Sequence, residues 1–217
     1  MIETIIDITL EIPVDNKKLT GDLVLPKNCN GIILFSHGSG SSRLSPRNRY
    51  VASSLQENGI GTFMFDLLTP EEDNFSARFD IDLLTSRLTA VTEWIIKQEY
   101  CTGLGVGIFG ASTGAASALN SAAILGDKVK AVVSRGGRPD LALPTLPDVK
   151  AATLLMVGSL DYYVIQLNEQ AYGMLKSPKQ LIIISDAGHL FEEEGKLEEV
   201  ADHAGRWFLK YLTKTGK

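Results

Sequence analysis

A serine stands between glycines in the segment GIFGASTGAASAL, residues 107–119, where an apolar run gives way to small residues. The pentapeptide at residues 110–114 has the pattern G-x-S-x-G at the point where a predicted strand turns into a predicted helix. A sharp turn of this kind lifts the hydroxyl out of the sheet edge, and the flanking glycines remove side chains that would collide with neighbouring strands. Ser112 is therefore predicted to be a nucleophile, although the pentapeptide alone also fits an ordinary turn serine.

A serine hydroxyl needs a base to become nucleophilic, and the base needs an acceptor that orients it. Asp161 follows the apolar run LLMVGSL, and His189 follows the run LIIISDAG. The order serine, aspartate, histidine along the chain leaves room for a crossover helix in each interval. The residues thus predict a triad of Ser112, Asp161 and His189 that catalyses acyl transfer.

Other residues compete for the acid and base roles. Asp140 follows the preceding strand and Asp186 lies three residues before His189, but Asp161 fits the end of a strand better. His203 falls in the middle of a predicted helix, where a solvent-facing or packed side chain is expected. His37 ends a strand, and its side chain is expected to hold the following loop by hydrogen bonds.

The tetrahedral oxygen of an acyl-transfer reaction needs hydrogen-bond donors. One predicted donor is the backbone N–H of Thr113, directly after the nucleophile, and the other is that of Ser39 in the loop HGSGSSR. Glycines on either side of Ser39 let this loop bend toward a substrate; the alternative is a flexible turn with no catalytic role.

Two arginines follow the strand VKAVVSR and could face the substrate side. Arg135 and Arg138 are predicted to bind a carboxylate-bearing substrate, since a guanidinium is a planar fork of donors. The alternative is that they pair with Asp66, Asp80 or Asp140 and hold loops in place.

The elements that must position these residues alternate along the chain. The runs TIIDITLEI and LTGDLVLP alternate apolar with polar residues, which is typical of an antiparallel hairpin. Later runs are continuously apolar and are separated by segments of helical period, such as SPRNRYVASSLQENG. In this segment Ser45 is predicted to cap the helix, Pro46 to take its first position and Gly59 to end it. This alternation predicts an α/β fold with a mostly parallel central sheet of about eight strands and helices on both faces. The segment between the sixth and seventh strands is too short for a large cap.

Composition and charge exclude several classes of protein. With 217 residues, of which 44% are hydrophobic, the chain is expected to form a single domain over residues 1–217. The net charge of −5 does not indicate the basic surface that binds nucleic acid. No apolar run approaches a membrane span, and the first residues do not resemble a signal peptide, so a cytoplasmic location is expected. The sequence leaves open whether Cys29 and Cys101 form a disulfide. The spacing of the three histidines does not match a metal-binding motif.

Several motifs together resemble one family. The segments HGSGSSRLSPRNR, FDLLTPEE, GIFGASTGAASAL, VVSRGGRPDLA, TLLMVGSLD and DAGHLFEEEG are similar to the dienelactone hydrolase-like branch of the α/β-hydrolases, including hydrolase domains fused to phosphoribosyltransferases. The resemblance spans about residues 18 to 212. It implies the α/β-hydrolase fold, no cofactor, and hydrolysis of an ester or lactone. Dienelactone hydrolases proper use a cysteine where this chain has Ser112, which favours general carboxylesterase chemistry.

The sequence is thus interpreted as a serine hydrolase of small carboxylic esters or lactones, with a small-molecule ester as its partner. An acyltransferase of the same fold and a non-catalytic binding module are the alternatives. The natural substrate and the oligomeric state are not determined by these residues.

Overall fold

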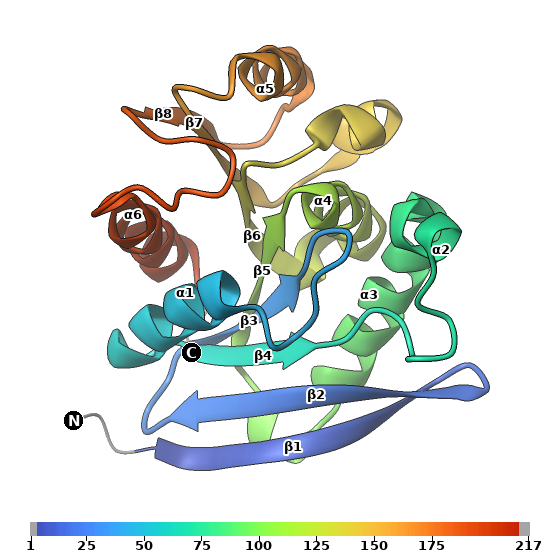
Figure 1. The fold of residues 1–217 in the computed structure, drawn as a ribbon. Coiled ribbons are helices and arrows are strands. Elements are labelled where there is room, and N and C mark those ends of the chain that lie inside the picture. Colours follow the sequence, from blue (N-terminus) through green and yellow to red (C-terminus); the bar gives the residue numbers. More distant parts are fainter. Residues whose placement is uncertain (1–3, 213–217) are drawn as a thin grey trace.

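The computed structural model describes residues 4–212, which form a mixed sheet of eight strands (Figure 1). The strand order is β1-β2-β4-β3-β5-β6-β7-β8, in which β2 pairs antiparallel with β1 and β4, and β4-β3-β5-β6-β7-β8 pair parallel. The strands are β1 (Thr4–Val14), β2 (Lys17–Pro26), β3 (Gly31–Ser36), β4 (Gly61–Phe65), β5 (Gly105–Ala111), β6 (Val129–Arg135), β7 (Ala152–Gly158) and β8 (Lys179–Ile184). The predicted α/β fold with a mostly parallel sheet is confirmed.

Helices cover both faces of the sheet, as Figure 1 shows. They are α1 (Pro46–Glu57), α2 (Phe75–Phe79), α3 (Ile81–Ile95), α4 (Thr113–Leu125), α5 (Tyr162–Met174) and α6 (Lys196–Tyr211), with 3₁₀ segments η1 (Glu99–Cys101), η2 (Gly126–Lys128) and η3 (Pro139–Asp148). One apolar core lies between the sheet and α1 with α6, and a second lies between the sheet and α3, α4, α5 and η3. Between β6 and β7 the chain forms η3 and no larger cap.

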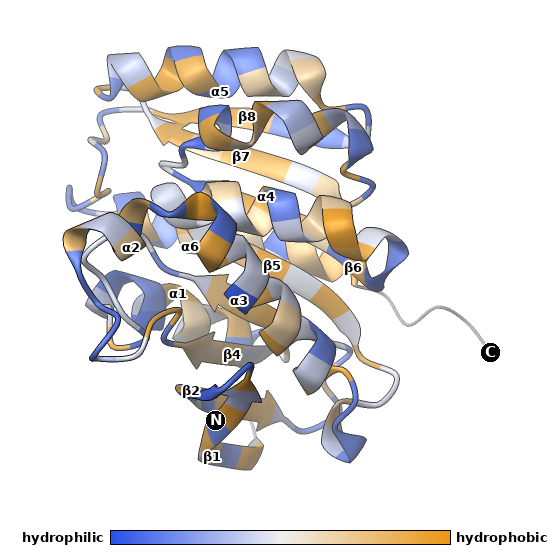
Figure 2. Ribbon diagram, turned by 90° about the vertical axis from the view of Figure 1, so that its right-hand side faces the viewer, coloured by the Kyte–Doolittle hydropathy of each residue, from blue (hydrophilic) through white to orange (hydrophobic). Residues whose placement is uncertain are grey.

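The strands follow the hydrophobic pattern of the sequence. Every residue of β3, β4 and β7 is buried, as expected for strands with helices on both sides. In β2, buried residues alternate with more exposed ones, because one face of the β1–β2 hairpin is open to solvent. Figure 2 shows β7 and β8 as largely hydrophobic and the helices as striped with hydrophobic and hydrophilic residues.

Helix α1 begins at the predicted cap, and its C-cap is Asn58, one residue before the predicted Gly59. The Ser45 side chain accepts a hydrogen bond from the N–H of Asn48 at 3.4 Å, Pro46 occupies the first helical position, and Gly59 just after the helix has φ +73°. Helix α2 was not predicted. None of its five residues is buried, and a helix this short has too few positions to show a helical period.

The carboxyl ends of the six parallel strands lie at one edge of the sheet, and the loops that follow them carry the candidate site. At the opposite edge, Cys29 and Cys101 precede the neighbouring strands β3 and β5, and no disulfide joins them. Burial raises the pKa of the Cys101 thiol to about 12. Within residues 4–212, no helix combines the length and apolar character that a membrane crossing requires.

Candidate active site

Ser112 occupies a strained turn between β5 and α4. Its backbone has φ 52° and ψ −123°, a conformation that costs about 1–3 kcal/mol for a residue with a side chain. The flanking glycines permit this turn, because a Cβ on Gly110 would lie 2.6 Å from the Cα of Ala115 and one on Gly114 would lie 2.6 Å from the carbonyl oxygen of His37. The G-x-S-x-G spacing is thus required by close backbone packing.

The neighbouring strand β6 holds the backbone of Ser112. The N–H of Ser112 donates to the carbonyl oxygen of Arg135 at 3.2 Å, and the carbonyl oxygen of Ser112 accepts from the N–H of Arg138 at 3.0 Å. Ser112 is half-buried, and its hydroxyl makes no hydrogen bond to any residue in the range 4–212. Its oxygen is therefore available for chemistry.

An aspartate and a histidine meet at the ends of β7 and β8. Oδ2 of Asp161 lies 2.6 Å from Nδ1 of His189, with 17% of the aspartate side chain and 39% of the histidine side chain exposed. The two strand ends pack closely, since a Cβ on Gly158 would lie 2.6 Å from the carbonyl carbon of Ala187. The Asp161 carboxylate can therefore fix the proton of the imidazole on Nδ1.

The histidine lies beside the turn that carries the serine. A Cβ on Gly136 would lie 3.6 Å from Cε1 of His189, and Gly136 follows Arg135, whose carbonyl oxygen receives the N–H of Ser112. The three predicted triad residues thus follow β5, β7 and β8 at one edge of the sheet, with the end of β6 between the serine and the other two. The structure shows no hydrogen bond from Ser112 Oγ to the ring, a contact that often tightens only when substrate binds.

The competing acids and bases have other partners. Both carboxylate oxygens of Asp140 accept from the guanidinium of Arg138 at 2.8 Å. The backbone N–H of Asp186 donates to Ser159 Oγ at 2.8 Å, and its carboxylate does not contact His189. His203 lies on α6, where its Nδ1 is 3.3 Å from the guanidinium of Arg206. Asp161 is the carboxylate that the fold brings to the imidazole of His189.

His37 connects two loops at the sheet edge. Its Nε2 accepts the backbone N–H of Leu67 at 3.1 Å, so Nδ1 carries the proton, 3.1 Å from the carbonyl oxygen of Gly38. Burial holds the pKa of His37 below its usual value. The neutral ring thus joins the loop after β3 to the loop after β4.

The two predicted oxyanion donors lie side by side, but one of them is already bonded. The N–H of Ser39 donates to the side-chain Oγ1 of Thr113 at 2.9 Å. Thr113 is buried at the first position of α4, where a backbone N–H has no partner within the helix. Thr113 therefore contributes its backbone to one donor position and its hydroxyl to the placement of the other. The sequence pointed to its backbone and did not reveal the side-chain contact.

The two arginines that were predicted to bind substrate have different partners in the structure. Arg138 is engaged by Asp140, as in the alternative considered for it. Arg135 is buried, and its Nη2 donates to Oδ1 of Asn48 at 3.3 Å. Burial, and then the neighbouring charge of Arg47, lowers the pKa of Arg135 to about 10. A role for either arginine in substrate binding stays a prediction.

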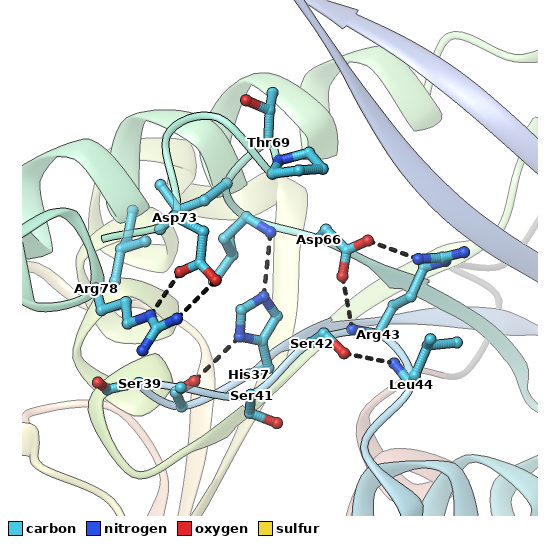
Figure 3. Close-up of a pocket in the computed structure, with 16 residues that line it drawn as sticks. His37, Ser39, Ser41, Ser42, Arg43, Leu44, Asp66, Thr69, Asp73 and Arg78 are labelled. Atoms are coloured by element: carbon cyan, nitrogen blue, oxygen red, sulfur yellow. Dashed lines mark hydrogen bonds and ion pairs between the residues drawn. The ribbon is translucent and has the colours of Figure 1, made fainter. Parts of the chain in front are cut away.

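A cavity of about 270 Å³ opens next to the candidate oxyanion donors (Figure 3). It is lined by residues 37–44, by residues 66–70, and by Asp73, Arg78 and Leu84. The cavity lies against the serine turn, since a Cβ on Gly38 would be 3.1 Å from Cβ of Ser112. Sequence reasoning missed this cavity, because its two walls follow β3 and β4, whose pairing the sequence does not state.

Fold and site together define an α/β-hydrolase: a strained serine at the first turn after a central parallel strand, and an Asp–His pair at later strand ends. A solved structure of a dienelactone hydrolase from Anabaena variabilis is 52% identical to the chain, with a TM-score of 0.93, and the match covers 95% of this chain and 98% of that one. The chain belongs to this dienelactone hydrolase-like branch of the α/β-hydrolases. The resemblance seen in the motifs is thereby confirmed.

More distant structures share the fold. Est1E from Butyrivibrio proteoclasticus matches with a TM-score of 0.80 at 17% identity, over 93% of this chain and 98% of its own. An esterase from Pyrococcus furiosus matches with a TM-score of 0.78 at 17% identity, over 95% of this chain and 91% of its own. At this identity the likeness concerns the fold alone.

Among curated proteins, two from Mycobacterium tuberculosis that carry the name of a proposed phosphoribosyl transferase are 51% identical over 199 residues. The match covers 91% of this chain and 45% of each relative, so the chain spans less than half the length of these relatives. This agrees with a hydrolase-like domain that also occurs in longer chains. No family model matches the chain.

Proposed function

We propose that the protein is a serine hydrolase that cleaves small carboxylic esters or lactones through an acyl-enzyme, without a cofactor. The observation that carries this proposal is the 2.6 Å contact between Asp161 and His189 beside a serine in a strained strand-to-helix turn. Membership in a hydrolase branch with 52% identity to a solved relative supports the class of reaction. The serine in place of cysteine favours esters in general over dienelactone itself.

The proposed mechanism follows from the arrangement of these three side chains. Asp161 keeps the proton of His189 on Nδ1, so Nε2 is free to accept the proton of Ser112 as Oγ attacks the carbonyl carbon. The carbonyl oxygen becomes an oxyanion, which accepts hydrogen bonds from the backbone N–H of Thr113 and from that of Ser39, which turns from Thr113 Oγ1 to the oxyanion. Collapse of the tetrahedral intermediate expels the alcohol, which takes the proton from Nε2, and the acyl group stays on Oγ.

Water then completes the turnover. Nε2 of His189 removes a proton from a water molecule as the water oxygen attacks the acyl carbon, and the second intermediate releases the carboxylic acid and returns the proton to Ser112. An alcohol or amine in place of this water would give acyl transfer, and the same residues serve both reactions. Added acceptors would reveal this alternative as a new ester or amide among the products.

The test combines a panel of aryl and alkyl esters with labelling by a fluorophosphonate, which reacts with an activated serine. The wild type should hydrolyse members of the panel and gain one label on Ser112, located by peptide mass spectrometry. Ser112→Ala should lose labelling and several orders of magnitude in kcat, with a residual rate from the remaining site. Ser53→Ala, on the exposed face of α1, is the matched control and should behave as the wild type.

Two results would overturn the proposal. Undiminished ester turnover by Ser112→Ala would show that another group is the nucleophile. Failure of the folded wild type to take the label or to cleave any ester would favour the non-catalytic binding module.

A further inference from the structure

The cavity beside the oxyanion loop, shown in Figure 3, begins where the proposed chemistry takes place. Gly38 and Ser39 line it, and the same two residues lie against Ser112 and Thr113. At about 270 Å³ it is near the lower limit of roughly 300–1,000 Å³ for small-molecule pockets. It can therefore hold one small group of an ester that is bound at Ser112.

Two ion pairs form opposite parts of the cavity wall. Asp66 accepts from the backbone N–H of Arg43 at 2.9 Å and from its Nη1 at 2.7 Å. Asp73 accepts from Nε of Arg78 at 2.6 Å and from its Nη2 at 2.8 Å, and this bond holds the pKa of Asp73 below its usual value. Both pairs are drawn in Figure 3, with Arg43 and Arg78 on opposite sides of His37.

The charges that line the cavity cancel. Two arginines face two aspartates, and the remaining titratable group, His37, is neutral because its Nε2 accepts a backbone N–H and burial lowers its pKa. An anionic ligand would meet guanidinium groups that are already paired with carboxylates, and a cationic ligand would meet carboxylates that are already paired with guanidinium groups. The wall therefore favours a ligand without net charge.

A hydroxyl group suits a wall of this composition. It donates one hydrogen bond and accepts others, and each Arg–Asp pair presents N–H donors next to carboxylate acceptors. The hydroxyls of Ser39 and Ser41, which also line the cavity, make no hydrogen bond to another residue in the range 4–212. Leu67, Leu68 and Leu84 supply an apolar surface for the carbon skeleton of the same ligand.

We infer that this cavity binds a neutral, hydroxyl-rich group of the ester, a single polyol or sugar unit on either side of the scissile bond. The inference rests on the proposed ester hydrolysis and names the class of substrate. It differs from the prediction that arginines read a carboxylate, because every arginine that lines the cavity has an aspartate partner.

The test uses pairs of esters that differ in hydroxyl groups alone. Glycerol 1-acetate and propyl acetate differ on the alcohol side, whereas ethyl 2,3-dihydroxypropanoate and ethyl propanoate differ on the acid side. For at least one pair, kcat/KM of the hydroxylated ester should exceed that of its plain analogue by about tenfold or more, as expected for a hydroxyl bonded to a charged group.

A pair of substitutions locates the effect. The double variant Asp73→Asn with Arg78→Gln keeps the shape and the zero net charge of the wall but removes one of its two ion pairs, so the ratio between the two esters should fall severalfold. Asp202→Asn with Arg206→Gln is the matched control, since it removes an exposed Arg–Asp pair on α6, far along the chain from the cavity. Its ratio should equal that of the wild type.

The outcomes separate this inference from the proposed function. If turnover depends on Ser112 but neither pair shows a preference for hydroxyls, the cavity inference is wrong and ester hydrolysis stands. A second contradicting result would be a ratio of kcat/KM between monoethyl succinate and ethyl butyrate that exceeds the ratio for either hydroxylated pair. The cavity would then favour an anionic ligand. If no ester is cleaved by a Ser112-dependent reaction, the proposed function falls and the inference falls with it.

Discussion

Replacement of Asp161 by asparagine should disable the proposed base while leaving the fold in place. Oδ2 of Asp161 is 2.6 Å from Nδ1 of His189, at the short end of charge-assisted hydrogen bonds. The carboxylate only accepts hydrogen bonds and so requires a proton on Nδ1. An amide at the same place can instead donate to Nδ1, which moves the proton of the neutral ring to Nε2. The atom that must accept the Ser112 proton is then already protonated.

The size of the effect follows from this change of tautomer. A triad in which the acid becomes an amide loses about 10⁴ in kcat, or roughly 5.4 kcal/mol at about 1.36 kcal/mol for each tenfold change. The cost in stability should be about 1 kcal/mol or less, since the histidine side chain is 39% exposed and Asp161 makes no side-chain cap on α5. Melting should therefore shift by no more than about 4 °C.

The assay is ester hydrolysis by purified variants under saturating substrate, with a thermal melt of each variant. Asp140→Asn and Asp186→Asn are the matched controls, because each removes a carboxylate at the same sheet edge that does not contact His189. The reasoning is refuted if Asp161→Asn stays within tenfold of the wild-type kcat, or if one of the two controls suffers the larger loss.

Three further predictions concern the walls of the site. Thr113→Val should lower kcat/KM by up to about 10²-fold, because the Ser39 N–H loses the Thr113 hydroxyl that holds it in position. Thr113→Ser keeps this hydroxyl and should restore the rate. An unchanged preference for oxo over thiono esters in Thr113→Val would contradict this role. Gly114→Ala should prevent stable folding, because the added Cβ would collide with backbone carbonyls. Gly173→Ala, in open space on α5, should instead raise the free energy of unfolding by up to about 1 kcal/mol, measured by denaturant unfolding. Equal effects of the two substitutions on stability would contradict this reasoning. Burial lowers the pKa of His37 below 6.5, so the unfolded chain binds a proton that the folded chain resists, and the free energy of unfolding should fall as the pH drops below about 6.5. His37→Gln should flatten that decline, and an identical pH slope in the variant would count against it.

The sequence determined the features that depend on neighbouring residues. Continuous apolar runs separated by helical periods specify a parallel sheet, because strands covered on both faces have no polar side. The glycines at 110 and 114 specify the serine turn, because the space they leave is needed by backbone atoms a few residues away or on the adjacent strand. Capping of α1 by Ser45 is equally local and was predicted from Ser45 and the proline that follows it.

The tertiary structure decided which distant residues meet. Three aspartates follow strands in the sequence: Asp140, Asp161 and Asp186. Asp161 contacts His189 because the loops after β7 and β8 pack together, whereas Asp140 is paired with Arg138. The bond from Ser39 to Thr113 likewise depends on β3 lying next to β5.

The cavity depends on the same long-range pairing. Its walls follow β3 and β4, which are neighbours in the order β2-β4-β3-β5. Helix α2, none of whose residues is buried, adds Arg78 to the wall. A hydrophobic pattern states which side of each strand is buried, but strands of similar composition can satisfy that pattern beside many partners. The choice among them is made by the packing of the whole sheet and its helices. This is why candidate site residues could be proposed from local motifs, whereas the cavity beside them could not.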